Sequence, residues 1–266
     1  MYKSNSFSKS SFKVAFFFLG KRKKRALSAV YDFARYADDI VDENIKTPQK
    51  KLLELKTELE SLYNTQPSKL PAELKEAIDN FHLKQENFLN IIGGVSKDLE
   101  LVRYKNFESL KEYMFGVACS VGLICIDIFG YKNEETKKYA IKLGYAVQLT
   151  NIVRDFWEDA KINRIYIPKE DLERFGTTEN EILFLKNSDK INKLLNCYFT
   201  LSEFYYQAAL QSLPKEDKLK MFPAQIMLSV YRKLLFKIKK QNFNTFNNKI
   251  KLTSFEKFIS VLKACL

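Results

Sequence analysis

The sequence predicts an all-α fold. Its 266 residues include only eight Gly and six Pro, fewer than a turn-rich β-sandwich or a protein with glycine-rich phosphate loops needs. Apolar residues recur at helical spacing along most of the chain, and no stretch alternates convincingly as a strand. The absence of a repeat of about 20 to 50 residues argues against a solenoid. We therefore expect a bundle of long helices.

Two stretches without Gly or Pro predict the longest helices, one between Gly20 and Pro48 and one over residues 145–167. Residues 133–143 are expected to lead into the second of these, and residues 186–213 to add one or two more helices. Apolar spacing predicts the remaining helices at residues 52–63, 72–89, 109–128 and 221–240.

Composition favours a single domain over residues 1–266. Hydrophobic residues make up 46% of the chain, which is ample for one core, and no linker-like tract divides it. The apolar stretches 14–19 and 117–129 are too short to span a bilayer, and the first lacks a convincing cleavage site. Four scattered cysteines without a CxxC pair fit a reduced, cytoplasmic protein: Cys119, Cys125, Cys197 and Cys265.

His82 is the only histidine, which excludes a multi-histidine metal site. A Ser-His-Asp or Cys-His arrangement would have to use that one residue. The formal charge of +12 is unevenly placed, because residues 213–266 contain twelve Lys or Arg and three Asp or Glu. This excess indicates a polyanionic partner, such as nucleic acid, an anionic membrane or a phosphorylated substrate, or else a solvated Lys-rich surface.

Each long helix carries a polar stripe that ends in two carboxylates one turn apart. Like charges at this spacing repel by roughly 0.2–0.5 kcal/mol on an exposed helix. A single pair of this kind is most simply a solvent-exposed pair with Arg or Lys neighbours, but two pairs flanked by apolar residues favour a site. The stripes are Tyr31, Arg35, Asp38 and Asp42 on the first helix, and Gln148, Asn151, Asp155 and Asp159 on the second.

Two carboxylate pairs on facing helices, with Asn151 as an additional oxygen donor, form an oxygen-rich ligand set without His or Cys. Mg²⁺ suits such ligands, and Mn²⁺ can take the same set, whereas zinc and copper favour softer ligands. Arg35 and Arg154 lie within a turn of the carboxylates and are suited to bidentate contacts with a diphosphate. The sequence therefore predicts metal-assisted departure of diphosphate, driven mainly by electrostatics.

At these residues the sequence resembles the squalene/phytoene synthase family, whose members condense prenyl diphosphates head to head and have an all-α isoprenoid synthase (class I terpenoid synthase) fold. A first motif that also fits DDxxD would be weak alone, but the long second motif is specific. The matching segments run in family order over most of the chain: residues 8–12, 31–43, 112–122 with Tyr113, 148–159, 164–168 and 231–232.

The resemblance implies that five residues bind Mg²⁺: Asp38, Asp42, Asn151, Asp155 and Asp159. It implies that a second set contacts the diphosphate or the prenyl chain: Ser8, Lys9, Ser10, Ser11, Phe12, Phe16, Tyr31, Arg35, Gln148, Arg154 and Tyr231. Tyr113 resembles the tyrosine near the reacting cations, where its π face and phenol can stabilise positive charge; a core aromatic is the alternative. Asp98 matches a further acidic position of the family.

The mechanism implied by the resemblance begins when one allylic diphosphate ionises and the C2–C3 double bond of a second attacks the cation. Proton loss then gives a cyclopropylcarbinyl diphosphate, which some members convert onward to a linear triterpene or carotenoid precursor. Bulky Phe16 favours two C15 farnesyl chains and hence presqualene diphosphate, with phytoene synthesis from C20 chains as the rival. We expect no use of NADPH, although the sequence leaves reduction open.

Two further alternatives stay in view. A head-to-tail elongase or a terpene cyclase would share the first acidic motif but fits the second poorly. A non-enzymatic basic protein that binds nucleic acid or a membrane would leave both stripes unexplained, and we expect no nucleic-acid partner. We do expect the basic C-terminal region to associate peripherally with an anionic membrane. Three departures from the family pattern concern the shape of the site: Cys119, Ser96-Lys97 and Trp157.

Overall fold

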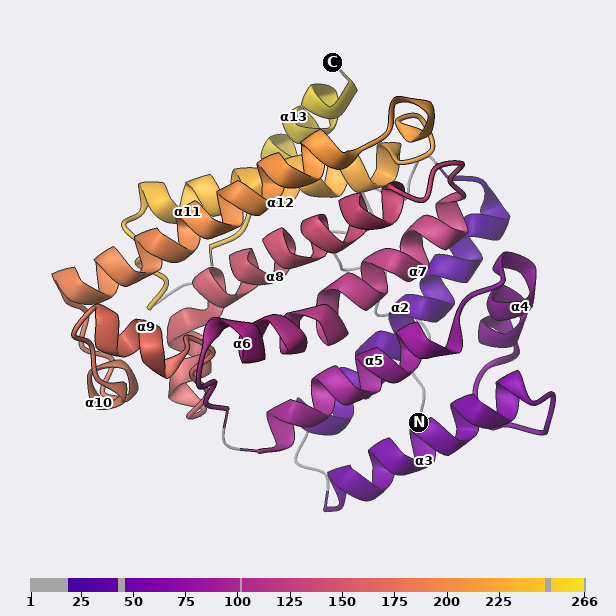
Figure 1. Cartoon of the computed structure of the whole chain (residues 1–266), viewed down its shortest axis with the longest axis horizontal. Helices are drawn as coiled ribbons and strands as arrows, with labels where there is room; N and C mark the ends of the chain where they lie inside the picture. Colours follow the sequence, from indigo (N-terminus) through magenta and orange to yellow (C-terminus); the bar gives the residue numbers. More distant parts are fainter. Residues whose placement is uncertain (1–18, 43–45, 101, 247–249, 266) are drawn as a thin grey trace.

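The computed structural model describes residues 19–42, 46–100, 102–246 and 250–265. Within these ranges the elements are helices, and one isolated bridge pairs Arg103 with Ile165. The prediction of an all-α fold is confirmed. In Figure 1 one long central helix lies between a pair of helices on one side and a shorter pair on the other: α8 (Thr136–Lys161) between α11 (Asp189–Ser212) with α12 (Phe222–Lys240), and α6 (Phe107–Met114) with α7 (Ser120–Phe129).

Between residues 21 and 96 the structure describes four α-helices: α2 (Lys21–Asp42), α3 (Pro48–Tyr63), α4 (Ala72–Phe81) and α5 (Gln85–Ser96). The first of them, α2, packs against α4, α5 and α7. The prediction of one helix over 72–89 was wrong, because the chain turns at His82. That residue adopts the left-handed conformation (φ 51°) and ends the first of two helices, a turn usually signalled by glycine.

A π-helical turn, η3 (Phe115–Cys119), separates α6 from α7 within the helix predicted over 109–128. At this turn the backbone passes very close to α5: a Cβ on Gly116 would lie 2.7 Å from the Asn90 carbonyl oxygen and 2.8 Å from Gly94 Cα. Only glycine permits this approach. The stretch Phe107–Phe129 has the length and hydropathy of a membrane span, but half of its most apolar window is buried within the fold, as in a core helix.

The C-terminal half differs from prediction in its connections. The helix expected to continue to residue 167 ends at Lys161, and Ile165 instead bridges to Arg103. Residues 186–213, where one or two helices were expected, contain the single helix α11 (Asp189–Ser212). Among the described residues of this half, three α-helices were not predicted: α9 (Lys169–Arg174), α10 (Glu179–Leu183) and α13 (Ser254–Cys265), the last of which packs against α12.

Buried polar contacts fix α8 in place. The fully buried carboxylate of Asp217 accepts hydrogen bonds from the backbone N–H groups of Lys132 (2.8 Å) and Asn133 (3.0 Å) and from the Thr136 hydroxyl (2.7 Å). Farther along, the Thr150 hydroxyl lies 2.9 Å from that of Tyr206 on α11. These contacts hold α8 at its start and its middle, which matters because this helix carries the second polar stripe.

Candidate active site

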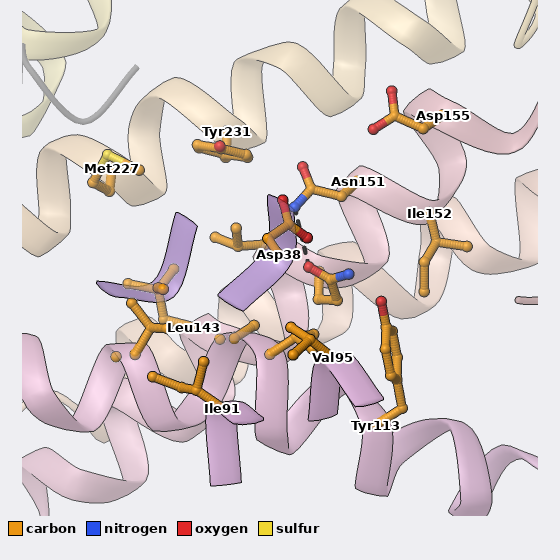
Figure 2. A pocket seen from close by; sticks show the side chains of 18 of the residues that line it. Asp38, Ile91, Val95, Tyr113, Leu143, Asn151, Ile152, Asp155, Met227 and Tyr231 are labelled. Carbon is orange, nitrogen blue, oxygen red and sulfur yellow. Dashed lines mark hydrogen bonds between the residues drawn. The ribbon is translucent and has the colours of Figure 1, made fainter. Parts of the chain in front are cut away.

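A cavity of about 970 Å³ lies among α2, α5, α7, α8 and α12, with η3 forming part of its wall. Figure 2 shows side chains from several of these helices pointing into it. Six predicted site residues lie outside the described residues: Ser8, Lys9, Ser10, Ser11, Phe12 and Phe16. The cavity brings together all the others: Tyr31, Arg35, Asp38, Asp42, Tyr113, Gln148, Asn151, Arg154, Asp155, Asp159 and Tyr231.

The carboxylates of α2 stand beside two arginines. Arg35 donates from Nη1 to Asp38 Oδ2 at 2.9 Å, and from Nη2 to Asp39 Oδ1 at 2.6 Å. Asp42 Oδ1 accepts from Nη1 of Arg164 at 2.8 Å, although these residues are far apart in sequence. Burial and the neighbouring Asp42 charge raise the pKa of Asp38 to about 6, against the opposing effect of Arg35. A carboxylate held in this way gains most from a bound cation.

On α8 the Asn151 amide is held in one orientation by its neighbour, because its Nδ2 donates to Gln148 Oε1 at 3.1 Å. Its Oδ1 is buried and has no hydrogen-bond partner among the described residues. Arg154 donates from Nε to Asp155 Oδ1 at 2.9 Å, and both side chains are mostly buried. Figure 2 shows Asn151 and Asp38 among the side chains that line the cavity, one from α8 and one from α2.

These residues fit a divalent cation. A buried amide oxygen without a donor is a ready ligand, since a buried acceptor normally has a partner. Within the described ranges no group of three or more His, Cys, Asp and Glu lies close enough to hold a metal ion. Mg²⁺ commonly takes one or two carboxylates and fills its remaining positions with water and substrate phosphate. The two carboxylate pairs match that division of ligands.

Tyr113 belongs to a polar cluster in the cavity wall. Its hydroxyl donates to Asp98 Oδ2 at 3.1 Å, and the hydroxyl of Tyr166 donates to Asp98 Oδ1 at 3.0 Å. The Tyr113 and Tyr166 rings stack at 5.2 Å, and Tyr104 packs beside both. Burial raises the pKa of Asp98, and Arg164 opposes this. The phenol of Tyr113 is therefore bonded, while its ring lines the cavity.

Sequence reasoning missed two members of this site, Arg164 and Tyr166. Both belong to the segment 164–168 that carried part of the family resemblance, so the signal was present, but no role was assigned to either. Both line the cavity. The helix α8, which carries the second acidic motif, ends at Lys161. The loop that follows folds back toward the cavity, so residues a few positions after the motif also line the site.

The remainder of the cavity is apolar, with walls that include Ile91, Val95, Leu143 and Met227. None of the three departures from the family pattern lies among the residues that line it. Trp157 is buried and stacks on Phe246 at 3.9 Å. Cys119 lies behind the wall, where a Cβ on Gly144 would come within 2.7 Å of Cys119 Cα. Lys97 pairs with Glu112 at the surface.

Comparison with known proteins agrees with these motifs. The family model described as squalene/phytoene synthase matches residues 7–256. The chain belongs to the squalene/phytoene synthase family. Among its squalene/phytoene synthase relatives, presqualene diphosphate synthase of Zymomonas mobilis is 31% identical over 91% of this chain and 84% of its own length. Phytoene synthase 1 of Solanum lycopersicum is 30% identical over 90% of this chain.

Solved structures of the squalene/phytoene synthase type show the same fold. A dehydrosqualene synthase superposes with a TM-score of 0.89 at 29% identity, covering 97% of this chain and 92% of its own. A squalene synthase from Alicyclobacillus acidocaldarius superposes at 0.80 with 24% identity over 89% of this chain. The prediction of a class I terpenoid synthase fold is confirmed. This chain spans only 60% of the length of the Solanum lycopersicum relative.

Proposed function

We propose that this chain is a prenyltransferase that condenses two prenyl diphosphates head to head and releases diphosphate. The observation that carries the proposal is a single cavity with a carboxylate pair from each of two helices at one end and an apolar chamber beyond. The substrates we propose are two farnesyl diphosphates and the product presqualene diphosphate. Residues 1–266 act as one domain in this proposal.

The polar end would bind the diphosphate. Mg²⁺, when bound, neutralises the diphosphate and stabilises its departure as a leaving group. Arg35 and Arg154 supply additional positive charge, and their planar guanidinium groups suit paired phosphate oxygens. Tyr31, Gln148 and Tyr231 line the same end. The metal ligands in this proposal are Asp38, Asp42, Asn151, Asp155 and Asp159.

The apolar chamber would protect the reaction from water. When the C1–O bond of the first substrate breaks, the electron pair leaves with the diphosphate and an allylic cation remains. The double bond of the second substrate then forms a bond to that carbon, and loss of a proton closes the cyclopropane ring. Tyr113 presents its ring to the chamber while Asp98 holds its hydroxyl at 3.1 Å. The aromatic face can stabilise the passing positive charge.

The choice of C15 over C20 chains is the finer part of the proposal. Relatives similar to this chain include both a presqualene diphosphate synthase and phytoene synthases. The dehydrosqualene synthase that superposes over 97% of this chain is consistent with the shorter substrates. Phytoene synthesis from two geranylgeranyl diphosphates is the second candidate. Conversion onward to a squalene-type product would add a second ionisation at the same polar end, and we expect no NADPH to be consumed.

Product analysis tests the proposal directly. Purified protein with Mg²⁺ is incubated with C15 or C20 diphosphate, with and without NADPH, and the products are identified by mass spectrometry. We expect presqualene diphosphate from the C15 substrate and loss of turnover in Asp38→Asn and in Asp155→Asn. Glu60→Gln, a carboxylate on the outer helix α3, serves as the control. Full turnover in both aspartate variants would exclude the metal assignment.

We also propose that the protein works in the cytoplasm and associates peripherally with the inner face of an anionic membrane. One face of α13 leaves large apolar side chains exposed: Phe255 (71%), Phe258 (57%) and Leu262 (49%). The helix also packs on α12, and the neighbouring Val261 side chain is buried. An apolar stripe beside lysines is typical of a helix that lies in the membrane interface and attracts anionic lipid.

Flotation with lipid vesicles tests this association. We expect binding to vesicles that contain phosphatidylglycerol, weaker binding to pure phosphatidylcholine, and loss of binding in salt. The double variant Phe255→Ala/Phe258→Ala should weaken it further. Phe184, equally exposed at 71% but outside the basic region, provides the matched control Phe184→Ala. If binding depends on neither anionic lipid nor salt concentration, the proposed membrane association is wrong and the C-terminal lysines are simply a solvated surface.

A further inference from the structure

Tyr139 lies in the first turns of α8, at the apolar end of the cavity. Its side chain is fully buried. Its hydroxyl has no hydrogen-bond partner among the described residues. A buried hydroxyl without a partner costs free energy, and phenylalanine would fill almost the same space without that cost. The presence of tyrosine here therefore points to a role beyond packing.

The position of Tyr139 follows from the direction of α8. The residues that this helix contributes to the cavity are apolar from Ala140 to Val147 and mainly polar from Gln148 to Asp159. At 1.5 Å per residue, Tyr139 lies about 14 Å along the axis from Gln148 and about 24 Å from Asp155. Tyr139 is thus the α8 cavity residue farthest from the proposed diphosphate site.

The end of the cavity at Tyr139 is braced on both sides. Phe129, the last residue of α7, lines the cavity with it, and the Phe129 carbonyl accepts a hydrogen bond from Lys23 Nζ at 2.7 Å. One turn before Tyr139, the Thr136 hydroxyl donates to buried Asp217 at 2.7 Å. Neither helix end can recede without breaking a hydrogen bond, so the Tyr139 ring is a fixed wall.

We propose that Tyr139 forms the floor of the prenyl chamber and limits the length of the prenyl chain. This inference rests on the proposed function, because it takes the diphosphate to bind at the opposite, polar end. One isoprene unit is roughly 5 Å long, about one turn of an α-helix. A C20 chain would need one more unit of depth than a C15 chain, and would press its terminal methyl groups against the phenol.

The phenol would therefore oppose the longer chain in two ways. The ring occupies the volume, and a longer chain that displaced it would pack hydrocarbon against a buried hydroxyl that already lacks a hydrogen-bond partner within the described part of the chain. Tyr139→Phe removes only the polar atom, whereas Tyr139→Ala removes the ring as well. The two effects can thus be separated, and the preference for C20 should rise in that order.

A competition assay tests the floor. The full chain with Mg²⁺ receives equal concentrations of C15 and C20 diphosphates, and the ratio of C20-derived to C15-derived products is measured by mass spectrometry. We expect wild type to favour C15, Tyr139→Phe to raise the ratio modestly, and Tyr139→Ala to raise it roughly tenfold or more. Tyr139→Leu carries the same test if the alanine variant does not fold.

Leu195→Ala is the matched control, because Leu195 is fully buried in α11 and is not among the residues that line the cavity. It should destabilise the fold without moving the product ratio. If Tyr139→Ala or Tyr139→Leu retains C15 turnover but leaves the ratio of C20-derived to C15-derived products unchanged, Tyr139 does not limit chain length and the proposal is wrong. A wild-type protein that prefers the C20 substrate would also contradict the role of Tyr139, but it would still support head-to-head condensation. A wild-type protein that consumes neither diphosphate would contradict the proposed function, and the role of Tyr139 with it.

Discussion

Nη1 of Arg164 lies 2.8 Å from Oδ1 of Asp42, so the loop after α8 is tied to the end of α2. This ion pair joins the segments that carry the two acidic motifs. Arg164 is only 17% exposed, and its charge opposes the rise that burial causes in the pKa of Asp98. One guanidinium thus serves the carboxylates of two different parts of the cavity wall.

The first prediction concerns this arginine. Arg164→Gln removes a hydrogen bond between charged groups, which typically contributes about 1.5–3 kcal/mol, and frees Asp42 to move. We expect kcat/KM for prenyl diphosphate to fall at least roughly tenfold. Arg25 lies on α2, as Asp42 does, and forms an exposed ion pair with Glu76 on α4. Arg25→Gln breaks this pair and should change neither activity nor stability appreciably. Equal effects of the two variants would contradict a specific role for Arg164.

The second prediction is that metal binding depends on pH through Asp38. Because the pKa of Asp38 is raised to about 6, the carboxyl is protonated below that pH and ionised above it. Mg²⁺ needs the ionised form, so its apparent affinity should rise as pH increases through about 6. Isothermal titration with Mg²⁺ between pH 5 and 7.5 measures this. The Asp38→Asn variant should bind weakly at every pH, and a wild-type affinity that stays flat across pH 6 would count against the assignment.

The third prediction separates the ring of Tyr113 from its hydroxyl. Tyr113→Phe keeps the ring that faces the chamber but removes one of two phenol donors to Asp98. We expect a stability loss of about 1–2 kcal/mol, because the partly buried Asp98 carboxyl loses a hydrogen-bond donor, with turnover reduced but still measurable. Tyr113→Leu should lose turnover almost completely if the aromatic face stabilises the cation. Tyr104→Phe alters a neighbouring phenol of the same cluster and serves as the control.

The fourth prediction concerns stability and Asp127 on α7. Burial raises the pKa of Asp127 to about 6, despite the nearby Lys137 and Lys84. The folded protein therefore binds this proton more tightly than the unfolded chain does. Its contribution is fully present below about pH 4 and is lost as pH rises through 6, so the free energy of unfolding should fall over that window by roughly 1–3 kcal/mol.

Urea unfolding between pH 4 and 7 measures this slope. Asp127→Asn should make the slope shallower without abolishing it, because the pKa of Asp38 is also raised to about 6 and contributes over the same window. The variant should stabilise the protein at pH 7, because an uncharged side chain no longer bears the cost of burial. Asp79→Asn, on the exposed side of α4, should leave the slope unchanged. If the free energy of unfolding of the wild type rises through pH 6, and Asp127→Asn shows the same pH dependence, a group other than Asp127 controls stability in this range.

The fifth prediction concerns the attachment of α8. Asp217 is fully buried and accepts three hydrogen bonds, including one from the Thr136 hydroxyl. Asp217→Asn turns one acceptor into a donor that faces other donors, and should lower the free energy of unfolding by roughly 2–4 kcal/mol. Glu216→Gln changes the exposed neighbour and should cost far less. Thermal unfolding of the two variants side by side gives the comparison.

Much of the cavity's polar end could be predicted from sequence, because its chemistry lies on two helices. Once Asp38 and Asp155 were placed on helical stripes, the spacing fixed which neighbours share their faces. The structure places every described member of both stripes in one cavity. Helical periodicity is local, so residues such as Asn151 could be assigned before any packing was known.

Contacts between distant segments could not be predicted in this way. The pairing of Arg164 with Asp42 depends on the turn after Lys161, and the break at His82 lacks the glycine that usually marks a left-handed residue. The floor at Tyr139 depends on where α7 ends against α8. Each of these follows from three-dimensional packing, to which a single sequence gives no direct access.

The close approach of Gly94 and Gly116 has a consequence for anyone who wishes to redesign the product. Where α5 meets η3, a Cβ on Gly116 would lie only 2.7 Å from a backbone oxygen, so direct main-chain contact fixes the spacing between these two elements. The chamber can therefore be reshaped by exchanging the side chains that line it, such as Val95 and Val117, but the two backbones cannot be shifted by a larger residue at their contact. Mutational libraries should hold both glycines constant and vary the lining positions instead.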